Sequence, residues 1–592
     1  MEAAVKQTPP GRDLYSLRAR LRPTSDQPIA PAARPGGVSY QEGHSQAFWV
    51  ADRNAKANVS VNATLRLVTP HAYFYVQDGQ NVSTDKLRES GEVFESNIVA
   101  AALRFFIREW PVGPDGDPHI TILHTRASGP PGWYSSADEY PAAINPFSNE
   151  RRMIYVNLAS GSPGTSSYYA TIAHELQHSI QWAADPSEDT WINEGLSEFA
   201  VRLTGFGGAS SVGSFAAKPD TQLNAWAEDH DNTLPHYGAA YLFLSYFSEH
   251  YGGQEALKEL LMEKARGMSG VERVINRLGY ATTFDDIFAA WVVANFLDNP
   301  SLGDGHFGYK DLDIRVKAEP VDSFPIQSSA VVQQYAADYL EVRPPSPDVA
   351  IIFTGTNRVK LVPNDPYSGR TQWWSNRGDV MNTNLTRYFD LSGIDEASLS
   401  FWTWYDVEKD YDYAYVEVST DGGASWTILP GRYTTDANPN GNNLGYGYTG
   451  KSGGAVPTWV NEQIDLSPFA GQSVLIRFEY VTDDAYNGPG FVVDDISIPE
   501  MSYLDDAETD QGWTANGFIR ATNALPERFR VQLIKVGPAT EVESLPLNDD
   551  QTGQWIIRGF GREFERGVLV VSALAPVTTE PASYQYSIEP MR

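Results

Sequence analysis

Residues 168–200 read YYATIAHELQHSIQWAADPSEDTWINEGLSEFA, and the fold and chemistry of the chain are best inferred from this stretch. Its apolar residues recur with the period of one helical face, which predicts helices over Tyr168–Ala183 and Asn193–Thr204. In the first helix His174 and His178 are four residues apart, and such residues lie on one side of a helix. Both imidazoles can therefore reach a single metal ion.

Three glutamates accompany the histidine pair. Glu175 lies beside the imidazoles, where it can polarise a water on the metal. Glu194 can complete a three-ligand site with a fourth position left for water, which is the arrangement of catalytic zinc. Glu198, one turn later, can accept the N–H of a ligand imidazole and fix its tautomer. For both later glutamates, the alternative is a carboxylate placed near a helix N-terminus.

HELQH (174–178) followed by WINEGLSEFA (191–200) resembles the gluzincin metallopeptidases. With the following segment HYGAAYLFLSYFSEHYG (236–252), the layout is similar to secreted bacterial neutral proteases of the hyicolysin type. The resemblance implies a zincin-like catalytic domain with a sheet subdomain and a helical subdomain. It also implies three zinc ligands and one general base, which are His174, His178 and Glu194 as ligands and Glu175 as base.

Enzymes of this kind also use a Tyr or His to stabilise the oxyanion. Tyr237 is the first candidate and His236 the second, because both precede a helix expected to pack beside the zinc helices. The alternative for each is core packing or helix capping. The predicted strand Met153–Val156 is a candidate sheet edge that aligns an extended substrate, or else an ordinary internal strand.

The composition restricts the possible chemistry. The 592 residues include 44 Lys+Arg, 75 Asp+Glu and no cysteine, with a formal charge of −31. Without cysteine there is no disulfide framework or thiolate catalysis, so a bound metal must be held by His and carboxylates. So acidic a chain has no overall basic field to attract nucleic acid. The longest apolar run, Ile287–Leu297, falls short of the roughly 18 residues of a membrane span.

Four segments are expected along the chain. Residues 1–45 are rich in proline and predict a flexible linker with a short helix near Leu14–Leu21. Residues 46–315 predict the α+β catalytic domain, with strands first and helices after them. Residues 316–500 predict a β-sandwich or jelly roll, and residues 501–592 a smaller C-terminal β domain.

Hydrophobic periodicity also places the individual elements. The predicted helices outside residues 168–204 are Val93–Trp110, Gly238–Tyr251, Gln254–Ala265, Val271–Leu278 and Phe284–Leu297. The predicted strands of the first half are Val59–Val68, Ala72–Val76, Ile120–Leu123 and Met153–Val156. Those of the second half are Phe401–Tyr405, Tyr413–Thr420, Trp426–Leu429, Val474–Val481, Phe491–Ile498, Phe518–Ala521, Phe529–Ile534, Gln554–Phe560, Val568–Leu574 and Tyr584–Ile588.

The β region contains a second resemblance. FWTWYDVEKDYDYAYVEVSTDGGASW (401–426) together with residues 460–498 is similar to the jelly-roll module of immune inhibitor A-like metallopeptidases. Exposed Trp and Tyr side chains of such modules are candidates for binding glycans or proteins, although most are expected to be core.

Several acidic residues are candidate calcium ligands, because Ca²⁺ takes six to eight oxygens. In the β region these are Asp406, Glu408, Asp410, Asp412, Asp494 and Asp495. The alternative is a solvated acidic face. Residues 114–117 read PDGD, which favours a plain turn over a calcium loop.

These observations together predict a secreted zinc endopeptidase that acts on protein or peptide substrates, with accessory β-modules. The N-terminus MEAAVKQTPPGRD has no apolar region of a signal peptide, so the protein is expected to be either cytosolic or without its original leader. The resemblance and the module layout favour a secreted or cell-surface protein. One alternative is an aminopeptidase with the same zinc core, disfavoured by the absence of a Gly-x-Met-Glu-Asn segment. Another is a non-catalytic extracellular binding or adhesion protein on a protease-like scaffold.

Overall fold

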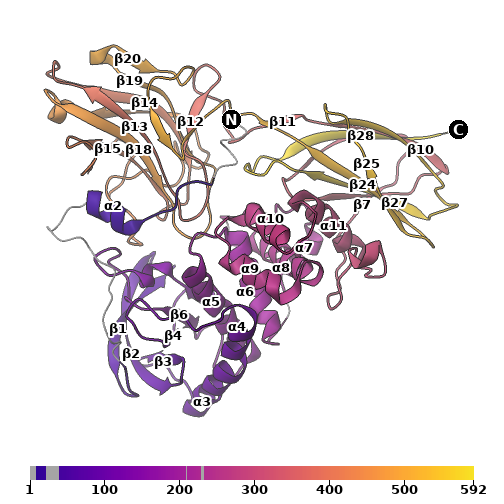
Figure 1. Cartoon of the computed structure of the whole chain (residues 1–592), viewed down its shortest axis with the longest axis horizontal. Helices are drawn as coiled ribbons and strands as arrows, with labels where there is room; N and C mark the ends of the chain where they lie inside the picture. Colours follow the sequence, from indigo (N-terminus) through magenta and orange to yellow (C-terminus); the bar gives the residue numbers. More distant parts are fainter. Residues whose placement is uncertain (1–7, 22–38, 208–209, 229–231, 592) are drawn as a thin grey trace.

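The computed structural model describes residues 8–21, 39–207, 210–228 and 232–591. It consists of a mixed α/β part, which contains the predicted metal-binding stretch, and two all-β sandwiches (Figure 1). In Figure 1 the indigo sheet and the magenta helices form the α/β part, with one sandwich above the sheet and the other extending to the right. The multidomain prediction is therefore confirmed at this level.

A six-stranded mixed sheet forms the first layer of the α/β part. Its spatial order is β1-β2-β3-β4-β6-β5, with β3, β4 and β6 parallel to one another and the remaining pairs antiparallel. The strands are β1 (Ser45–Asp52), β2 (Ala57–Val68), β3 (Ala72–Gln77), β4 (Ile120–Thr125), β5 (Gly132–Tyr134) and β6 (Met153–Asn157).

Helices cover one face of this sheet and continue into a helical layer (Figure 1). They are α3 (Thr84–Val93), the π-helical turn η1 (Phe94–Val99), α4 (Ala100–Phe105), α5 (Ser166–Ala184), α6 (Thr190–Leu203), α7 (Val212–Ala217), α8 (Thr233–His250), α9 (Gly253–Met262), α10 (Gly267–Arg277) and α11 (Phe284–Leu297).

The predicted helix Val93–Trp110 is misplaced. The helical segment begins at Thr84, because the Ser83 hydroxyl caps it by accepting a hydrogen bond from the Lys86 amide, and it ends at Phe105. Its first two turns are polar on most sides, so hydrophobic periodicity detected only the apolar second half. Phe284–Leu297, in contrast, is predicted with its observed bounds.

Packing in the core of the α/β part fixes α5 and α6, the two helices that carry the predicted site. On α5, Ile172, Leu176 and Ile180 are buried, and α8 is buried on all sides from Gly238 to Phe247. Gly195 lets α6 approach α8 closely, since a Cβ there would lie 2.9 Å from Leu244 Cδ1 and 3.0 Å from the Ala240 carbonyl oxygen. The helix packing therefore leaves little freedom for the residue next to Glu194.

The first sandwich packs two sheets around one core. One sheet contains β12 (Gln372–Trp374), β14 (Ser398–Asp406), β17 (Val460–Asp465), β19 (Gly490–Ile498), β20 (Tyr503–Asp505) and β22 (Ile519–Ala521). The other contains β13 (Asn382–Asp390), β15 (Tyr413–Ser419), β16 (Thr427–Ile428), β18 (Ser473–Val481) and β21 (Thr514–Asn516).

The second sandwich is assembled from two distant segments of the chain. One sheet contains β8 (Ile326–Val332), β10 (Asp348–Gly355), β26 (Thr552–Arg558) and β28 (Ala582–Pro590). The other contains β7 (Glu319–Val321), β9 (Asp338–Val342), β24 (Phe529–Val536), β25 (Glu541–Leu545) and β27 (Arg566–Ala573). Between the segments, β11 (Arg358–Val359) pairs with β23 (Leu525–Pro526).

The predicted boundary at residue 500 does not follow this strand pairing. Residues 319–359 pair with residues 525–590, so the first sandwich is an insertion within the second. Periodicity located β24, β26, β27 and β28 but predicted no strand within residues 319–359. It also contains no information on which distant strands pair.

Part of the predicted flexible linker is docked. The helix α2 (Leu14–Leu21) forms where it is predicted, and its Leu17 and Leu21 are buried against the first sandwich. Arg20 donates hydrogen bonds to Glu417 and Glu479, which are buried. Residues 1–7 and 22–38 of the predicted linker lie outside the described residues.

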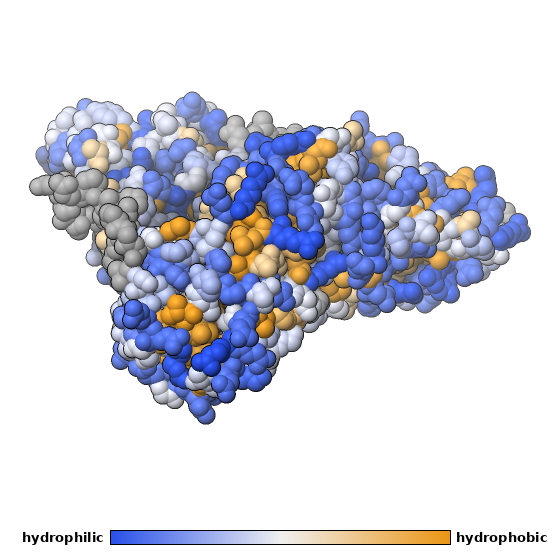
Figure 2. Space-filling view, turned by 60° about the horizontal axis from the view of Figure 1, so that its bottom comes forward, coloured by the Kyte–Doolittle hydropathy of each residue, from blue (hydrophilic) through white to orange (hydrophobic). Residues whose placement is uncertain are grey.

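In the part of the chain that the structure describes, no helix combines the length and apolar character needed to cross a membrane. The face shown in Figure 2 is mostly hydrophilic, with hydrophobic residues in separate small patches.

Candidate active site

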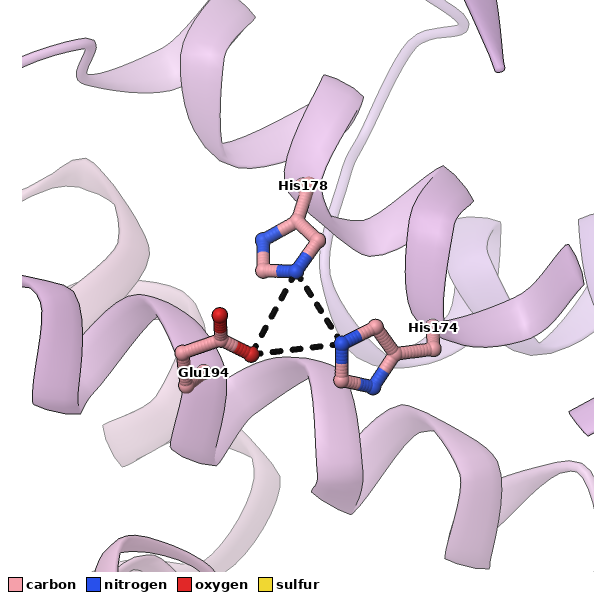
Figure 3. Close-up of side chains that lie close together, drawn as sticks. All are labelled: His174, His178 and Glu194. Carbon is pink, nitrogen blue, oxygen red and sulfur yellow. Dashed lines mark hydrogen bonds and ion pairs between the residues drawn. The ribbon is translucent and has the colours of Figure 1, made fainter. Parts of the chain in front are cut away.

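The three predicted metal ligands come together between α5 and α6. The Nε2 atoms of His174 and His178 are 3.1 Å apart, and Glu194 Oε2 lies 3.2 Å from the first and 3.5 Å from the second. Figure 3 shows both imidazoles, from one helix, pointing at the carboxylate of the next helix. Among the described residues, these three side chains form one of two groups that could hold a metal ion.

These distances fit a zinc ion. Zn–N and Zn–O bonds of about 2.0–2.2 Å in tetrahedral geometry place neighbouring ligand atoms about 3.3–3.5 Å apart, close to the three separations observed. Glu194 Oε2 is also enclosed by protein and accepts no hydrogen bond of acceptable geometry. A buried carboxylate oxygen without such a bond is costly unless a cation neutralises it, so the donor set suits a metal.

The electrostatics of the site keep Glu194 charged. Burial alone would raise its pKa, but the imidazoles of His178 and His174 outweigh that and hold the pKa of the carboxyl well below its usual range. For His174, burial opposes protonation, while the neighbouring carboxylates of Glu194 and Glu198 outweigh burial and raise its pKa.

Neighbouring side chains orient both imidazoles. His174 Nδ1 lies 3.3 Å from Glu198 Oε1, the residue predicted to accept from a ligand imidazole. His178 Nδ1 lies 2.9 Å from Asn193 Oδ1 and 3.2 Å from Ser197 Oγ. When each Nδ1 donates to its oxygen acceptor, each Nε2 presents a lone pair to the shared point.

Asn193 and Ser197 were not predicted as site residues. Both flank Glu194 on α6, one residue before it and three after it, so the helical spacing contained a usable signal. Asp189 at the N-cap of α6, by comparison, makes no side-chain cap hydrogen bond.

Glu175 is buried on the sheet side of the site. Its exposed fraction is 7%, and the backbone of Tyr134 in β5 favours its charged form by hydrogen bonding. Burial is the larger influence, however, and raises the pKa of Glu175. A raised pKa brings a carboxylate closer to the range in which it accepts and returns a proton near neutral pH.

The structure separates the two oxyanion candidates. Tyr237 faces the site, with its hydroxyl donating to Glu194 Oε1 over 3.4 Å and its ring 6.2 Å from the ring of His174. His236 instead lies against Trp226, with ring centroids 5.6 Å apart, and burial lowers its pKa to about 4. Trp226 also packs edge-on against Tyr237, with a centroid distance of 4.8 Å.

Of the two alternatives for Met153–Val156, the internal strand is confirmed and the sheet edge is wrong. In the structure β6 is paired on both sides, with β4 and with β5, and the short strand β5 is the edge. Only three residues of β5 pair, too few for periodicity to reveal a strand.

The PDGD segment forms the turn that its sequence favours, and three of the six candidate calcium ligands of the β region contact other groups. Residues 113–117 form a turn that two backbone hydrogen bonds close. The Gly113 amide donates to the Asp117 carbonyl oxygen, and the Gly116 amide donates to the Gly113 carbonyl oxygen. Asp406 lies 3.7 Å from Lys451 Nζ, and Asp494 and Asp495 accept hydrogen bonds from Ser368. Glu408 and Asp412, in contrast, converge with Asp483.

Comparisons with known proteins identify one module of the chain. Residues 346–523 match the family model described as "Immune inhibitor A-like, MAM domain". This range contains the first sandwich but not residues 174–198 of the candidate site.

The curated relatives of the chain include two with names of proteases. The chain is 33% identical over 208 residues to "Pre-pro-metalloprotease PrtV" of Vibrio cholerae serotype O1, which covers 35% of this chain and 21% of that protein. It is 30% identical over 177 residues to "Immune inhibitor A" of Bacillus thuringiensis subsp. alesti, covering 28% and 24%. It is 27% identical over 146 residues to "Bacillopeptidase F" of Bacillus subtilis, covering 24% and 9%. The chain thus spans less than a quarter of the length of these relatives.

The close contact between β5 and α5 generates a stability prediction. A Cβ at Gly132 would lie 2.8 Å from the Tyr155 carbonyl oxygen, 2.4 Å from Thr171 Cγ2 and 3.1 Å from Glu175 Cγ. Gly132→Ala should therefore lower the free energy of unfolding of the α/β part by about 1–3 kcal/mol. Thermal denaturation measures this.

Gly161→Ala is the matched control, because the nearest atom to a Cβ at Gly161 is 3.8 Å away. If both variants melt at the temperature of the unchanged chain, β5 does not pack on α5 as described.

Proposed function

We propose that the protein is a secreted zinc-dependent endopeptidase of the gluzincin type, similar to hyicolysin-like neutral proteases. The observation that carries the proposal is the convergence of two imidazole nitrogens and one carboxylate oxygen, 3.1–3.5 Å apart, beside the buried Glu175. Similarity to a protein named a metalloprotease supports it.

His174, His178 and Glu194 would hold the zinc ion. A zinc ion bound there would supply Lewis acidity, which polarises a peptide carbonyl and lowers the pKa of a bound water toward about 7. The carboxylate of Glu175 accepts a proton from the attacking water and returns it to the amine of the leaving group. The water oxygen first adds to the carbonyl carbon, and the C–N bond breaks once its nitrogen has received the proton, so the water is consumed and no other reactant is needed. Glu198 and Asn193 keep the imidazoles oriented.

Tyr237 is the proposed donor to the oxygen of the scissile carbonyl as that oxygen becomes negative. Its hydroxyl is already directed at the site, and Trp226 holds its ring from the side. His236 is not included, since it faces Trp226.

We propose that an extended substrate binds along the edge strand β5. Its backbone lies beside Glu175, and its outer edge has no strand partner among the described residues. A peptide added to β5 would gain main-chain hydrogen bonds and run past the site, which suits cleavage within a chain.

Two further features belong to the proposal. Secretion is supported by the likeness to immune inhibitor A and PrtV over part of their length. The sandwiches remain candidates for binding proteins or glycans, although most of the aromatic rings of the first sandwich are buried. An adhesion protein without catalysis would need no buried base at the centre, and Glu175 argues against that alternative.

Substitution of the proposed base tests the mechanism. Glu175→Gln should reduce kcat by about 10²–10⁴-fold, because a general base contributes that much, while zinc remains near one per chain. Peptide turnover and elemental analysis measure the two quantities. The exposed Glu92→Gln serves as control. Full activity of the Glu175 variant, or an unchanged chain that binds no zinc, contradicts the proposal.

The oxyanion role of Tyr237 has a separate test. Tyr237→Phe should lower kcat by about 10²–10³-fold at nearly constant zinc content, since one donor to the developing charge is lost. Tyr169→Phe is the matched control, because it removes a buried hydroxyl of α5 that has no hydrogen-bond partner among the described residues. Equal kcat values for both variants would assign Tyr237 to packing.

Blocked peptides distinguish endopeptidase from aminopeptidase. An N-acetylated fluorogenic peptide should be cleaved internally at a rate similar to its free-amine counterpart, because no amine-binding segment has been found in the sequence. Mass spectrometry of the products locates the cleaved bond. Turnover of the free-amine peptide alone would favour the aminopeptidase.

A further inference from the structure

Three carboxylates converge in the first sandwich on the side that meets the α/β part. Glu408 and Asp412 lie in the loop after β14, and Asp483 follows β18. One oxygen from each lies within 4.8 Å of one from each of the others. Asp412 and Asp483 are buried, and Glu408 is partly buried. The first two were predicted as calcium ligands from sequence, whereas Asp483 was not.

The cluster has an enclosed ligand atom without a hydrogen bond. Glu408 Oε2 is buried and accepts no hydrogen bond from the described residues. Asp412 is held by the Tyr480 hydroxyl at 3.1 Å and by the Asp483 amide at 2.9 Å, which fixes its direction. Among the described residues, no Lys, Arg or His nitrogen lies within 4.0 Å of the three carboxylates. Arg12 is near enough to favour the charged form of Asp483 without forming an ion pair.

Three close acidic groups without a paired cation are unfavourable when buried. Burial, followed by repulsion from Asp483, raises the pKa of Glu408 and of Asp412. A hard divalent cation removes this repulsion, and Ca²⁺ accepts carboxylate, carbonyl and water oxygens in flexible numbers. Three carboxylates leave room for several water or carbonyl ligands.

The cluster is connected to the metal-binding helix through backbone and side-chain contacts. The Asp483 carbonyl oxygen accepts a hydrogen bond from the Val380 amide at 2.5 Å. In the same loop, Asn487 Nδ2 donates to Asp379 Oδ1 at 2.8 Å. The other oxygen, Asp379 Oδ2, accepts from the backbone amide of Thr190 at 3.0 Å and from its hydroxyl at 2.5 Å.

Thr190 is the first residue of α6, the helix that carries Glu194. The N-cap residue of α6 makes no side-chain cap hydrogen bond, so Asp379 of the first sandwich supplies the carboxylate that this helix terminus requires. Arg266 secures the same segment by donating to the Asp379 carbonyl oxygen at 2.7 Å. A sandwich residue thereby helps to hold the helix of a proposed zinc ligand.

We propose that Glu408, Asp412 and Asp483 bind one calcium ion, and that this ion fixes the 483–487 loop and thereby the Asp379 cap on α6. The binding step is independent of the proposed peptidase function. The effect of the ion on the Asp379 cap can be measured as deuterium uptake in α6, without any measurement of peptidase activity.

Cation binding is tested on the full chain with Glu175→Gln, so that proteolysis does not interfere. Terbium luminescence, sensitised by Tyr480 beside Asp412, should appear and be displaced by Ca²⁺. Glu408→Gln and Asp412→Asn should each weaken Ca²⁺ binding at least tenfold. Asp410→Asn is the matched control, because it removes a charge from the same loop outside the cluster and Asn tolerates the φ of 68° there.

Calorimetric titration with Ca²⁺ of the chain with the intact cluster measures binding directly, so the proposal is still tested if a cluster variant fails to fold. Absence of Ca²⁺ binding in that titration overturns the proposal. Equal affinity of the two cluster variants and the Asp410 control also overturns it, since the ion would then bind elsewhere.

Hydrogen exchange tests the coupling. Removal of Ca²⁺ at constant zinc content should accelerate deuterium uptake severalfold in peptides covering residues 190–203, and leave residues 284–297 unchanged. In Glu408→Gln the uptake of residues 190–203 should no longer respond to Ca²⁺. Calcium binding with no change in α6 would refute the coupling. Loss of peptidase activity is not used as a readout, so a failure of the proposed function is distinguishable from a failure of this inference.

Discussion

The contact of Glu194 Oε2 with the Nε2 atoms of His174 and His178 is the interaction on which the proposed site depends. The two histidines belong to α5 and the glutamate to α6, so the contact exists only while the helices keep a fixed relation. Buried apolar residues of α5 and α8 provide part of this constraint, and Gly195 permits the close approach of α6 to α8. Packing at interior density transmits small shifts, so core changes near Gly195 are expected to move Glu194, the proposed ligand.

The first sandwich contributes to the same constraint. Asp379 satisfies the backbone amide of Thr190 at the start of α6, and Arg266 of the α/β part donates in return to the Asp379 carbonyl oxygen. The sandwich is therefore more than an appended module, since one of its carboxylates completes a helix of the candidate site. Because the first sandwich is inserted in the second, it is also connected to that sandwich at both of its ends.

Local features of the structure could be predicted from sequence, whereas most distant contacts could not. The spacing of His174 and His178 and the periodicity of Phe284–Leu297 are properties of single helices, and the structure has both. The pairing of residues 319–359 with 525–590, the edge position of β5 and the role of Asp379 depend on contacts between remote segments. One sequence contains no direct signal for them. Asp483 could not be predicted as a partner of Glu408 and Asp412 either, because the two loops that carry them meet only in the folded structure.

The proposed peptidase requires one zinc ion between α5 and α6. The most direct test is anomalous X-ray diffraction from crystals of the zinc-loaded chain, collected on both sides of the zinc absorption edge. One strong zinc peak is expected within about 2.0–2.2 Å of His174 Nε2, His178 Nε2 and a Glu194 carboxylate oxygen. A peak at another group of residues, or an intact site with no zinc peak, would contradict it.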